Sequence, residues 1–239
     1  MLECLKMSKY FKKLVKILKR RYPFLLNIYY QFRFVFRALY LKEPRAHLLW
    51  IIKRGDSKAY KNFDLNNKSI FFDVGGFKGD YTQKILEYYD CKSFIFEPHK
   101  IYFEEINQRF LKNENVHVFN YGLGATTEKL FLTDSNDGSK VTNKKTEIKI
   151  DIKDVVEVIE ELGIKKIDLL KLNIEGSEYD LLERLINSEK IKIIKKLKIQ
   201  FHQNIPNHNI RRENIRKKLN TTHKEIWSYY FVWERWDLR

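Results

Sequence analysis

Short apolar runs alternate with longer amphipathic segments along most of this chain. The runs are rich in Ile, Leu, Val and Phe, as expected of buried parallel strands, and the segments between them repeat their apolar residues at helical spacing. The predicted strands cover residues 70–74, 93–98, 116–120, 129–133, 146–150, 168–172, 195–201 and 229–233. The predicted helices cover residues 81–89, 102–112, 154–162, 179–187 and 210–219. This alternation predicts an α/β, Rossmann-like fold with a mostly parallel central sheet and helices on both faces.

A glycine-rich turn follows the first of these strands. Ile70–Val74 leads into Gly75, Gly76 and Gly79, and a helical segment comes next. Glycines let the backbone turn tightly and approach a ligand closely, and the free N–H groups at the start of the helix face that ligand. The sequence therefore predicts a cofactor-binding turn that includes these three glycines.

The details of this turn favour S-adenosyl-L-methionine over a dinucleotide. A dinucleotide site has the pattern G-x-G-x-x-G, and here Phe77 stands where its central glycine would be. Asp73, two residues before the first glycine, would repel a pyrophosphate but suits the cationic amino group and the hydroxyls of S-adenosyl-L-methionine. An ordinary strand–helix turn without a ligand is the alternative interpretation.

Two further positions suit the nucleoside part of such a cofactor. Glu97 ends the next strand and lies 24 residues after Asp73, close to the spacing at which a strand-end acid binds ribose hydroxyls. Asn120 ends the strand after that, where its side chain could hydrogen-bond the adenine ring. A solvated carboxylate and a plain turn are the respective alternatives.

A third strand–glycine–helix segment, together with the first two, resembles a known family. The segment is Lys171–Glu178, and the tail adds residues 199–202, 211–216 and 231–234. These patterns resemble the FkbM-type class I methyltransferases, whose motifs are D-x-G-x-x-x-G-x-x-T, E-P and K-I-D-x-E-G-x-E. The resemblance covers about residues 65–239, includes Thr82 in the first motif, and is closest to the branch associated with bacterial surface polysaccharides. It implies S-adenosyl-L-methionine as cofactor and a sugar hydroxyl as acceptor.

Two positions depart from the family pattern. The family has Asn where Phe77 stands, although an aromatic version also occurs, and Asp where Asn173 stands. An amide does not titrate, so Asn173 cannot act as a base, but it can still hydrogen-bond a cofactor. If the family's Asp must be anionic, the chain would instead be a non-catalytic scaffold with a degenerate methyltransferase fold.

The candidate catalytic residues follow the late strands. Methyl transfer to a hydroxyl needs an aligned nucleophile and a group that removes its proton. Glu175 and Glu178 follow one strand and His202 follows the next, at the sheet edge where ligands bind in open α/β folds. The alternatives are a structural histidine at a strand end and a glutamate that caps its helix. The acids show no spacing that specifies a metal, and none is predicted.

The charge of the chain is concentrated at its N-terminal end. Residues 1–60 carry +12 of the total +15, and apolar positions repeat at helical spacing from Met7 to Leu18 with lysines opposite. We predict a basic, aromatic-rich helical extension over residues 1–60 and a methyltransferase domain over residues 61–239. Peripheral contact of residues 1–40 with an anionic membrane competes with plain packing on the domain. No stretch suits a membrane span or a signal peptide.

Taken with these observations, the resemblance implies a bacterial O-methyltransferase that uses S-adenosyl-L-methionine and acts on a sugar hydroxyl of a surface glycan or its precursor. Two cysteines, Cys4 and Cys91, indicate a reducing compartment, so the expected location is cytoplasmic, with contact at the inner face of the membrane. The alternative within enzymes is a nucleic-acid methyltransferase. It is disfavoured because residues 61–239 are nearly balanced in charge.

Overall fold

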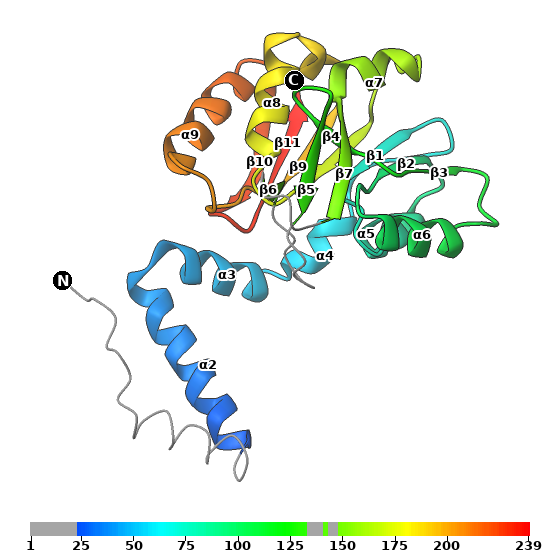
Figure 1. Cartoon of the computed structure of the whole chain (residues 1–239). Helices are drawn as coiled ribbons and strands as arrows, with labels where there is room; N and C mark the ends of the chain where they lie inside the picture. Colours follow the sequence, from blue (N-terminus) through cyan, green and yellow to red (C-terminus); the bar gives the residue numbers. More distant parts are fainter. Residues whose placement is uncertain (1–22, 133–140, 143–147) are drawn as a thin grey trace. The chain divides into compact units, whose positions relative to one another are not determined.

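The structure, a computed structural model, describes residues 23–132, 141–142 and 148–239, which fall into two compact units that separate between Lys53 and Arg54. The first unit contains helices α2 (Pro23–Tyr40) and α3 (Lys42–Ile52) (Figure 1). The Arg45 Nε of α3 donates to the carbonyl oxygen of Ala38 in α2 at 3.1 Å. None of the described helices has the length and hydropathy that a membrane span requires. The predicted helix around Met7–Leu18 lies outside the described residues.

The second unit begins with the short helix α4 (Gly55–Tyr60) and continues with alternating strands and helices. Its strands are β1 (Ile70–Val74), β2 (Lys92–Phe96), β3 (Val116–Phe119), β4 (Gly122–Gly124), β5 (Glu128–Leu132), β6 (Val141–Thr142), β7 (Ile148–Asp154), β8 (Leu169–Leu172), β9 (Lys196–Ile199), β10 (His223–Tyr229) and β11 (Trp233–Leu238). Its helices are α5 (Asp80–Tyr88), α6 (Lys100–Arg109), α7 (Val155–Glu161), α8 (Glu178–Asn187), the 3₁₀ helix Lys190–Ile193 and α9 (His208–Leu219).

Seven strands form the large sheet in the order β10-β11-β9-β8-β1-β2-β3. All of its registered neighbours pair in parallel except β11, which runs antiparallel to both β9 and β10. The predicted mostly parallel α/β fold is therefore confirmed. In such a sheet the carboxyl ends of the parallel strands lie at one edge, and the predicted site residues follow those ends.

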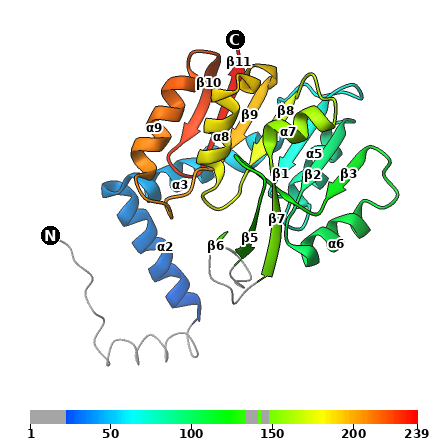
Figure 2. The ribbon, with the colours of Figure 1, turned by 45° about the horizontal axis from the view of Figure 1, so that its top comes forward.

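Helices cover both faces of this sheet, and each face has its own apolar core (Figures 1 and 2). The larger core packs α7, α8 and α9 against β1, β8 and β9, with Tyr179, Leu182 and Ile215 fully buried. On the other face, α5 and α6 pack against β1 and β2 through two smaller clusters that include Ile85 and Ile106. The central strands are buried on both faces, which explains their continuous apolar sequences.

Residues Tyr229–Trp233 do not form the predicted closing strand, and this prediction is wrong. Tyr229 ends β10, Trp233 begins β11, and the residues between them form a turn in which Val232 N–H donates to Tyr229 O at 2.9 Å. Phe231 adopts a left-handed φ of +52° there. The run is apolar because the turn is buried, with the Arg212 guanidinium 5.3 Å from the Phe231 ring centroid.

The described parts of the predicted strands 129–133 and 146–150, residues 129–132 and 148–150, lie in β5 and β7, which belong to a second sheet. It has four strands in the order β4-β7-β5-β6, with β5 and β7 antiparallel and β4 and β7 parallel. Asp154 ends β7 and begins α7, because its carboxylate accepts a hydrogen bond from the N–H of Val156 at 2.7 Å. The small sheet therefore connects directly to a helix that covers the large one.

Candidate functional site

The glycine turn after β1 is held tightly between its neighbours. Gly75 and Gly79 have φ values of +81° and +79°, which favour glycine. A Cβ on Gly75 would lie 2.1 Å from the carbonyl oxygen of Asn173, and a Cβ on Gly76 would lie 2.3 Å from Ile95 Cγ2. The turn therefore requires glycine at positions 75 and 76, because the segment after β8 and strand β2 leave no room for a side chain there.

Asp73 lies at the base of this turn and is fully buried. Its carboxylate accepts hydrogen bonds from Thr82 Oγ1 at 2.7 Å and from Lys171 Nζ at 2.8 Å. Lys171 Nζ also donates to the carbonyl oxygen of Gly75 at 2.7 Å. The predicted contact of Asp73 and Thr82 with the cofactor stays a prediction, and what the structure adds is that both side chains already have partners within the fold.

Glu97 connects the end of β2 to the same turn. Its carboxylate accepts from the N–H of Phe77 at 2.7 Å and from the N–H of His99 at 2.8 Å. Burial raises the pKa of this carboxyl to about 7, although the two backbone donors act in the opposite direction. Asn120 follows β3 and donates from Nδ2 to the carbonyl oxygen of Glu97 at 3.2 Å. The structure thus brings Glu97 and Asn120 together, and their roles with ribose and adenine stay predictions.

Two buried polar atoms at this edge have no hydrogen-bond partner within the described parts of the chain. They are Oδ1 of Asn173, after β8, and Nδ1 of His99, after β2. An unsatisfied buried polar group costs about 1–3 kcal/mol. A ligand whose hydroxyl and amino groups reach both atoms would remove this cost, so the residues present fit a polar, nucleoside-containing cofactor.

Glu178, which is fully buried, and His202, which is partly exposed, form a pair beside the segment after β8. The Glu178 carboxylate accepts from the N–H of Ile174 at 3.2 Å and from the N–H of Gly176 at 2.8 Å, and it hydrogen-bonds His202 Nδ1. On the other side of the ring, His202 Nε2 lies 3.4 Å from Glu175 Oε1. The three predicted catalytic residues therefore lie together, because α8 begins at Glu178 and β9 ends just before His202.

The two glutamates change the acid–base behaviour of His202. Burial alone would lower the pKa of the imidazole, but hydrogen bonds and charge from Glu175 and Glu178 outweigh it and raise the pKa to about 9. The imidazole is thus mostly protonated at pH 7. Within the described ranges, no group of three or more His, Cys, Asp and Glu side chains is arranged to hold a metal ion.

Lys171 and His99 are the site residues that sequence reasoning missed. Lys171 lies between leucines in a strand and is only 3% exposed, because its ammonium meets the buried Asp73 carboxylate. The signal was a lysine inside an otherwise apolar strand, which is costly unless it is paired. His99 follows Glu97-Pro98 and gave no separate signal, because its burial depends on the ring of Tyr102, with centroids 4.6 Å apart, and on the fold around it.

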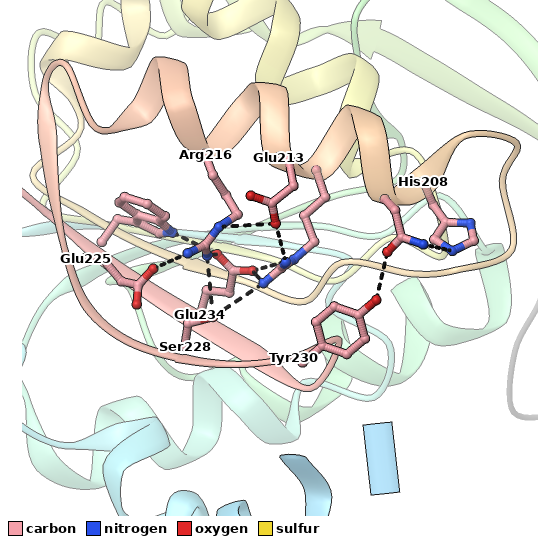
Figure 3. Close-up of polar contacts among 10 residues, drawn as sticks. His208, Glu213, Arg216, Glu225, Ser228, Tyr230 and Glu234 are labelled. Atoms are coloured by element: carbon pink, nitrogen blue, oxygen red, sulfur yellow. Dashed lines mark hydrogen bonds and ion pairs between the residues drawn. The ribbon is translucent and has the colours of Figure 1, made fainter. Parts of the chain in front are cut away.

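The tail residues that the family pattern includes assemble next to this site. Glu234 on β11 accepts from Arg212 Nε at 2.7 Å, from Arg216 Nη1 at 2.6 Å and from Trp236 Nε1 at 3.0 Å (Figure 3). Arg216 also pairs with Glu225. We call these five residues the C-terminal arginine cluster. Arg212 also lies over the ring of Phe201, the residue before His202, so the cluster supports the end of β9.

Comparisons with known proteins find one matching family and several similar solved structures. The family described as Methyltransferase FkbM domain matches residues 73–232. Among curated proteins, a sequence comparison finds no significant match. The similar solved structures include a putative rRNA methylase from Clostridium thermocellum, with 7% identity, a TM-score of 0.49, and coverage of 77% of this chain and 94% of that chain. Another is fibrillarin from Aeropyrum pernix with bound S-adenosyl-L-methionine, with 6% identity, a TM-score of 0.45, and coverage of 76% and 74%.

Proposed function

Because this chain belongs to the FkbM methyltransferase family and takes S-adenosyl-L-methionine as its cofactor, we propose that it methylates a hydroxyl group of a sugar. The acceptor in this proposal is a bacterial surface glycan or its lipid- or nucleotide-linked precursor. The cofactor supplies an activated methyl group, so the chain itself must bind the acceptor, orient its hydroxyl and remove the proton.

The observation that carries the O-methyl part of this proposal is the Glu178–His202 pair. A hydroxyl is a weak nucleophile, and a positioned base that takes its proton accelerates such reactions by about 10²–10⁴-fold. Glu178 is fully buried and fixes the ring through Nδ1, which leaves Nε2 toward the more exposed Glu175. In the proposed role, neutral His202 accepts the hydroxyl proton at Nε2, while Glu178 holds the orientation and stabilises the imidazolium that forms.

The raised pKa of His202 gives this role a distinctive pH dependence. A base must be unprotonated before it can act, and with a pKa of about 9 only roughly 1% of the imidazole is neutral at pH 7. The rate of methyl transfer should therefore rise roughly tenfold per pH unit between pH 7 and 9 and then level off. Glu175→Gln removes one of the charges that raise this pKa, so the rise should level off at a lower pH in that variant.

The experiment measures S-adenosylhomocysteine release with a panel of sugar and glycan acceptors between pH 6 and 10. His202→Gln should lower kcat about 10²–10⁴-fold with little change in the Kd for S-adenosyl-L-methionine. His208→Gln is the matched control, because His208 hydrogen-bonds the Ile205 carbonyl and lies outside the pair. A flat pH profile in the wild type, or full activity in His202→Gln, would contradict the base role.

The choice of a glycan acceptor rests on the family resemblance of the three motifs and the tail. The rival acceptor is a nucleic acid, which the overall charge of +15 would suit. We expect transfer to glycan precursors and none to RNA or DNA. Salt-dependent binding of RNA together with methyl incorporation into it would support the rival instead.

We also propose that the first unit contacts an anionic membrane, at the inner face of the cell membrane in the cytoplasm. Its helix α2 exposes many large apolar side chains, with Phe24, Phe32 and Tyr40 each more than 70% exposed. Arg33 and Arg37 lie between them. Aromatic residues beside arginines suit the interface of an anionic bilayer.

Vesicle co-sedimentation of the full chain tests this contact. We expect the wild type to bind vesicles that contain 30% phosphatidylglycerol and to bind pure phosphatidylcholine vesicles more weakly. The Phe32→Ser/Phe36→Ser variant should lose binding to the phosphatidylglycerol vesicles. Leu111→Ser is the control, because it removes an equally exposed apolar side chain from the second unit. Equal binding of the wild type and the aromatic variant would overturn the proposal.

A further inference from the structure

Two lysines lie side by side on neighbouring strands of the second unit, and both are buried. Lys171 on β8 is registered opposite Lys198 on β9. They are 3% and 1% exposed, and Asp73 is the carboxylate that ion-pairs with Lys171. A buried lysine is costly unless its ammonium finds partners, so the partners of each one indicate what it does.

Lys198 is held by aromatic rings and a carbonyl oxygen. Its Nζ lies 4.0 Å from the ring centroid of Trp233 and 4.3 Å from that of Tyr81, and it donates to the carbonyl oxygen of Ala59 at 3.3 Å. Burial, followed by the charge of Lys171, holds the pKa of Lys198 well below its ordinary value. These contacts attach α4 and α5 to the sheet, and none of them, among the residues that the structure describes, is with the glycine turn.

Lys171 reaches the glycine turn itself. Its Nζ donates to Asp73 Oδ1 at 2.8 Å and to the carbonyl oxygen of Gly75 at 2.7 Å. The other carboxylate oxygen of Asp73 accepts from Thr82 in the first turn of α5. One ammonium therefore fixes the end of β1 and the first residue of the turn, while the carboxylate it neutralises fixes the start of the helix that follows.

We infer that Lys171 is the positioning residue of the cofactor turn, and that Asp73 serves the cofactor through this turn rather than through its own charge. The inference rests on the cofactor, which the family establishes, and not on the proposed sugar acceptor. It opposes the direct reading in which the Asp73 carboxylate binds the cationic amino group of S-adenosyl-L-methionine.

The two readings predict opposite effects of Lys171→Met. If Asp73 binds the amino group directly, removing the competing ammonium leaves the affinity unchanged or raises it. If Lys171 positions the turn, the variant leaves a buried carboxylate unpaired and a carbonyl unbound, and the turn loses its geometry. We then expect the Kd for S-adenosyl-L-methionine to rise at least tenfold in calorimetric titrations of the full chain.

The double variant Asp73→Asn/Lys171→Met separates positioning from general damage. It removes both charges at once, so it should bind S-adenosyl-L-methionine more tightly than Lys171→Met alone. Lys198→Met is the matched control: it removes the neighbouring buried lysine and should lower the Tm without changing this Kd more than threefold. Lys171→Arg keeps the charge with a different shape, and it provides a measurable Kd if Lys171→Met does not fold.

The result that would overturn the inference is a Kd of Lys171→Met, or of Lys171→Arg in its place, that equals or falls below that of the wild type. A double variant that binds S-adenosyl-L-methionine more weakly than Lys171→Met alone would also overturn it. These experiments measure cofactor binding, so their results can be interpreted even if the proposed sugar acceptor is wrong.

Discussion

Glutamate carboxylates bind different kinds of partner in two regions of the molecule. One region is the edge of the large sheet that carries the glycine turn, here called the glycine-turn edge, and the other is the C-terminal arginine cluster. At the glycine-turn edge, Glu97 and Glu178 accept hydrogen bonds from backbone N–H groups of the turns beside them. In the cluster, Glu234 accepts from two arginine side chains and an indole (Figure 3). A carboxylate that binds backbone fixes the shape of a loop, whereas one that binds side chains fixes a helix to a sheet. The first arrangement shapes the turns of the candidate site, and the second attaches α9 to β11.

The largest effect is expected from neutralising the Glu234 carboxylate, which tests whether the arginine cluster and the glycine-turn edge are energetically separate. Glu234→Gln removes the buried carboxylate that pairs with both Arg212 and Arg216, which leaves them only the more exposed partners Glu213 and Glu225. Breaking a buried pair from one side costs about 3–5 kcal/mol. We expect a loss of this size in the free energy of unfolding, measured with urea, and an unchanged Kd for S-adenosyl-L-methionine. Arg211→Met is the control, since its partly exposed pairs with Asp180 and Glu183 should contribute no more than about 1 kcal/mol. A large loss of cofactor affinity in Glu234→Gln would show that the two regions are not separate.

The next largest effect is expected at the glycine turn. Gly75→Ala places a Cβ 2.1 Å from the Asn173 carbonyl oxygen at a φ of +81°, so the turn must shift. Strain of about 1–3 kcal/mol together with the displaced backbone should raise the Kd for S-adenosyl-L-methionine at least about 100-fold. Gly163→Ala has a similar φ of +64° but meets no atom within 4 Å, and it should leave the Kd unchanged. Calorimetry on both variants measures the difference, and similar affinities would show that the turn tolerates a side chain.

A smaller, pH-dependent effect is expected at Glu97. With a pKa of about 7, Glu97 is ionised above pH 7 and gains a proton below it. If its carboxylate accepts ribose hydroxyls, the Kd for S-adenosyl-L-methionine should rise roughly tenfold between pH 8 and 6, and Glu97→Gln should flatten this profile. Because the folded-state pKa lies above the unfolded value of 4.5, this group makes the folded state less stable as pH rises from about 4.5 to 7. A Kd that is constant between pH 6 and 8 would contradict the ribose role.

The smallest expected effect is at Thr82. Thr82→Val removes the hydrogen bond to Asp73 Oδ2 but keeps the shape of the side chain and the ion pair with Lys171. We expect a loss of about 1–2 kcal/mol in unfolding free energy and a rise of only a few fold in the Kd for S-adenosyl-L-methionine. Thr82→Ser, which keeps the hydroxyl, should restore the affinity. An effect as large as that of Gly75→Ala would mean that the hydroxyl contacts the cofactor.

Local patterns in the sequence predicted the parallel part of the sheet well. Residues 70–74 were predicted as a strand and form β1, which is buried on both faces and reads as an apolar run. Residues 116–120 were also predicted as a strand and form, over residues 116–119, the partly buried edge strand β3. The predicted helices 81–89 and 179–187 correspond to α5 and α8 within one residue. The antiparallel hairpin of β10 and β11 was missed, because β10 alternates exposed and buried residues and its turn carries the most apolar residues.

In the candidate site, too, local sequence predicted some features and not others. The glycines and the strand-end residues were predictable, because the carboxyl ends of parallel strands meet at one edge. The pairing of Asp73 with Lys171 was not, because 98 residues separate the two along the chain and only the β1–β8 register brings them together. The protonation of His202 was also out of reach, since it depends on two glutamates that lie around one ring only after α8 and β9 are in place.

The position of β11 also constrains the order in which the sheet can be completed. β11 lies between β9 and β10, yet it follows both of them in the chain. During synthesis, β10 emerges before the strand that separates it from β9, so it has no edge to join until residues 233–238 are available. In the native sheet, β10 is therefore attached only through β11, as the outer strand of the β10–β11 hairpin. Removing β11 would detach β10 as well and expose the edge of β9 to pairing with other chains.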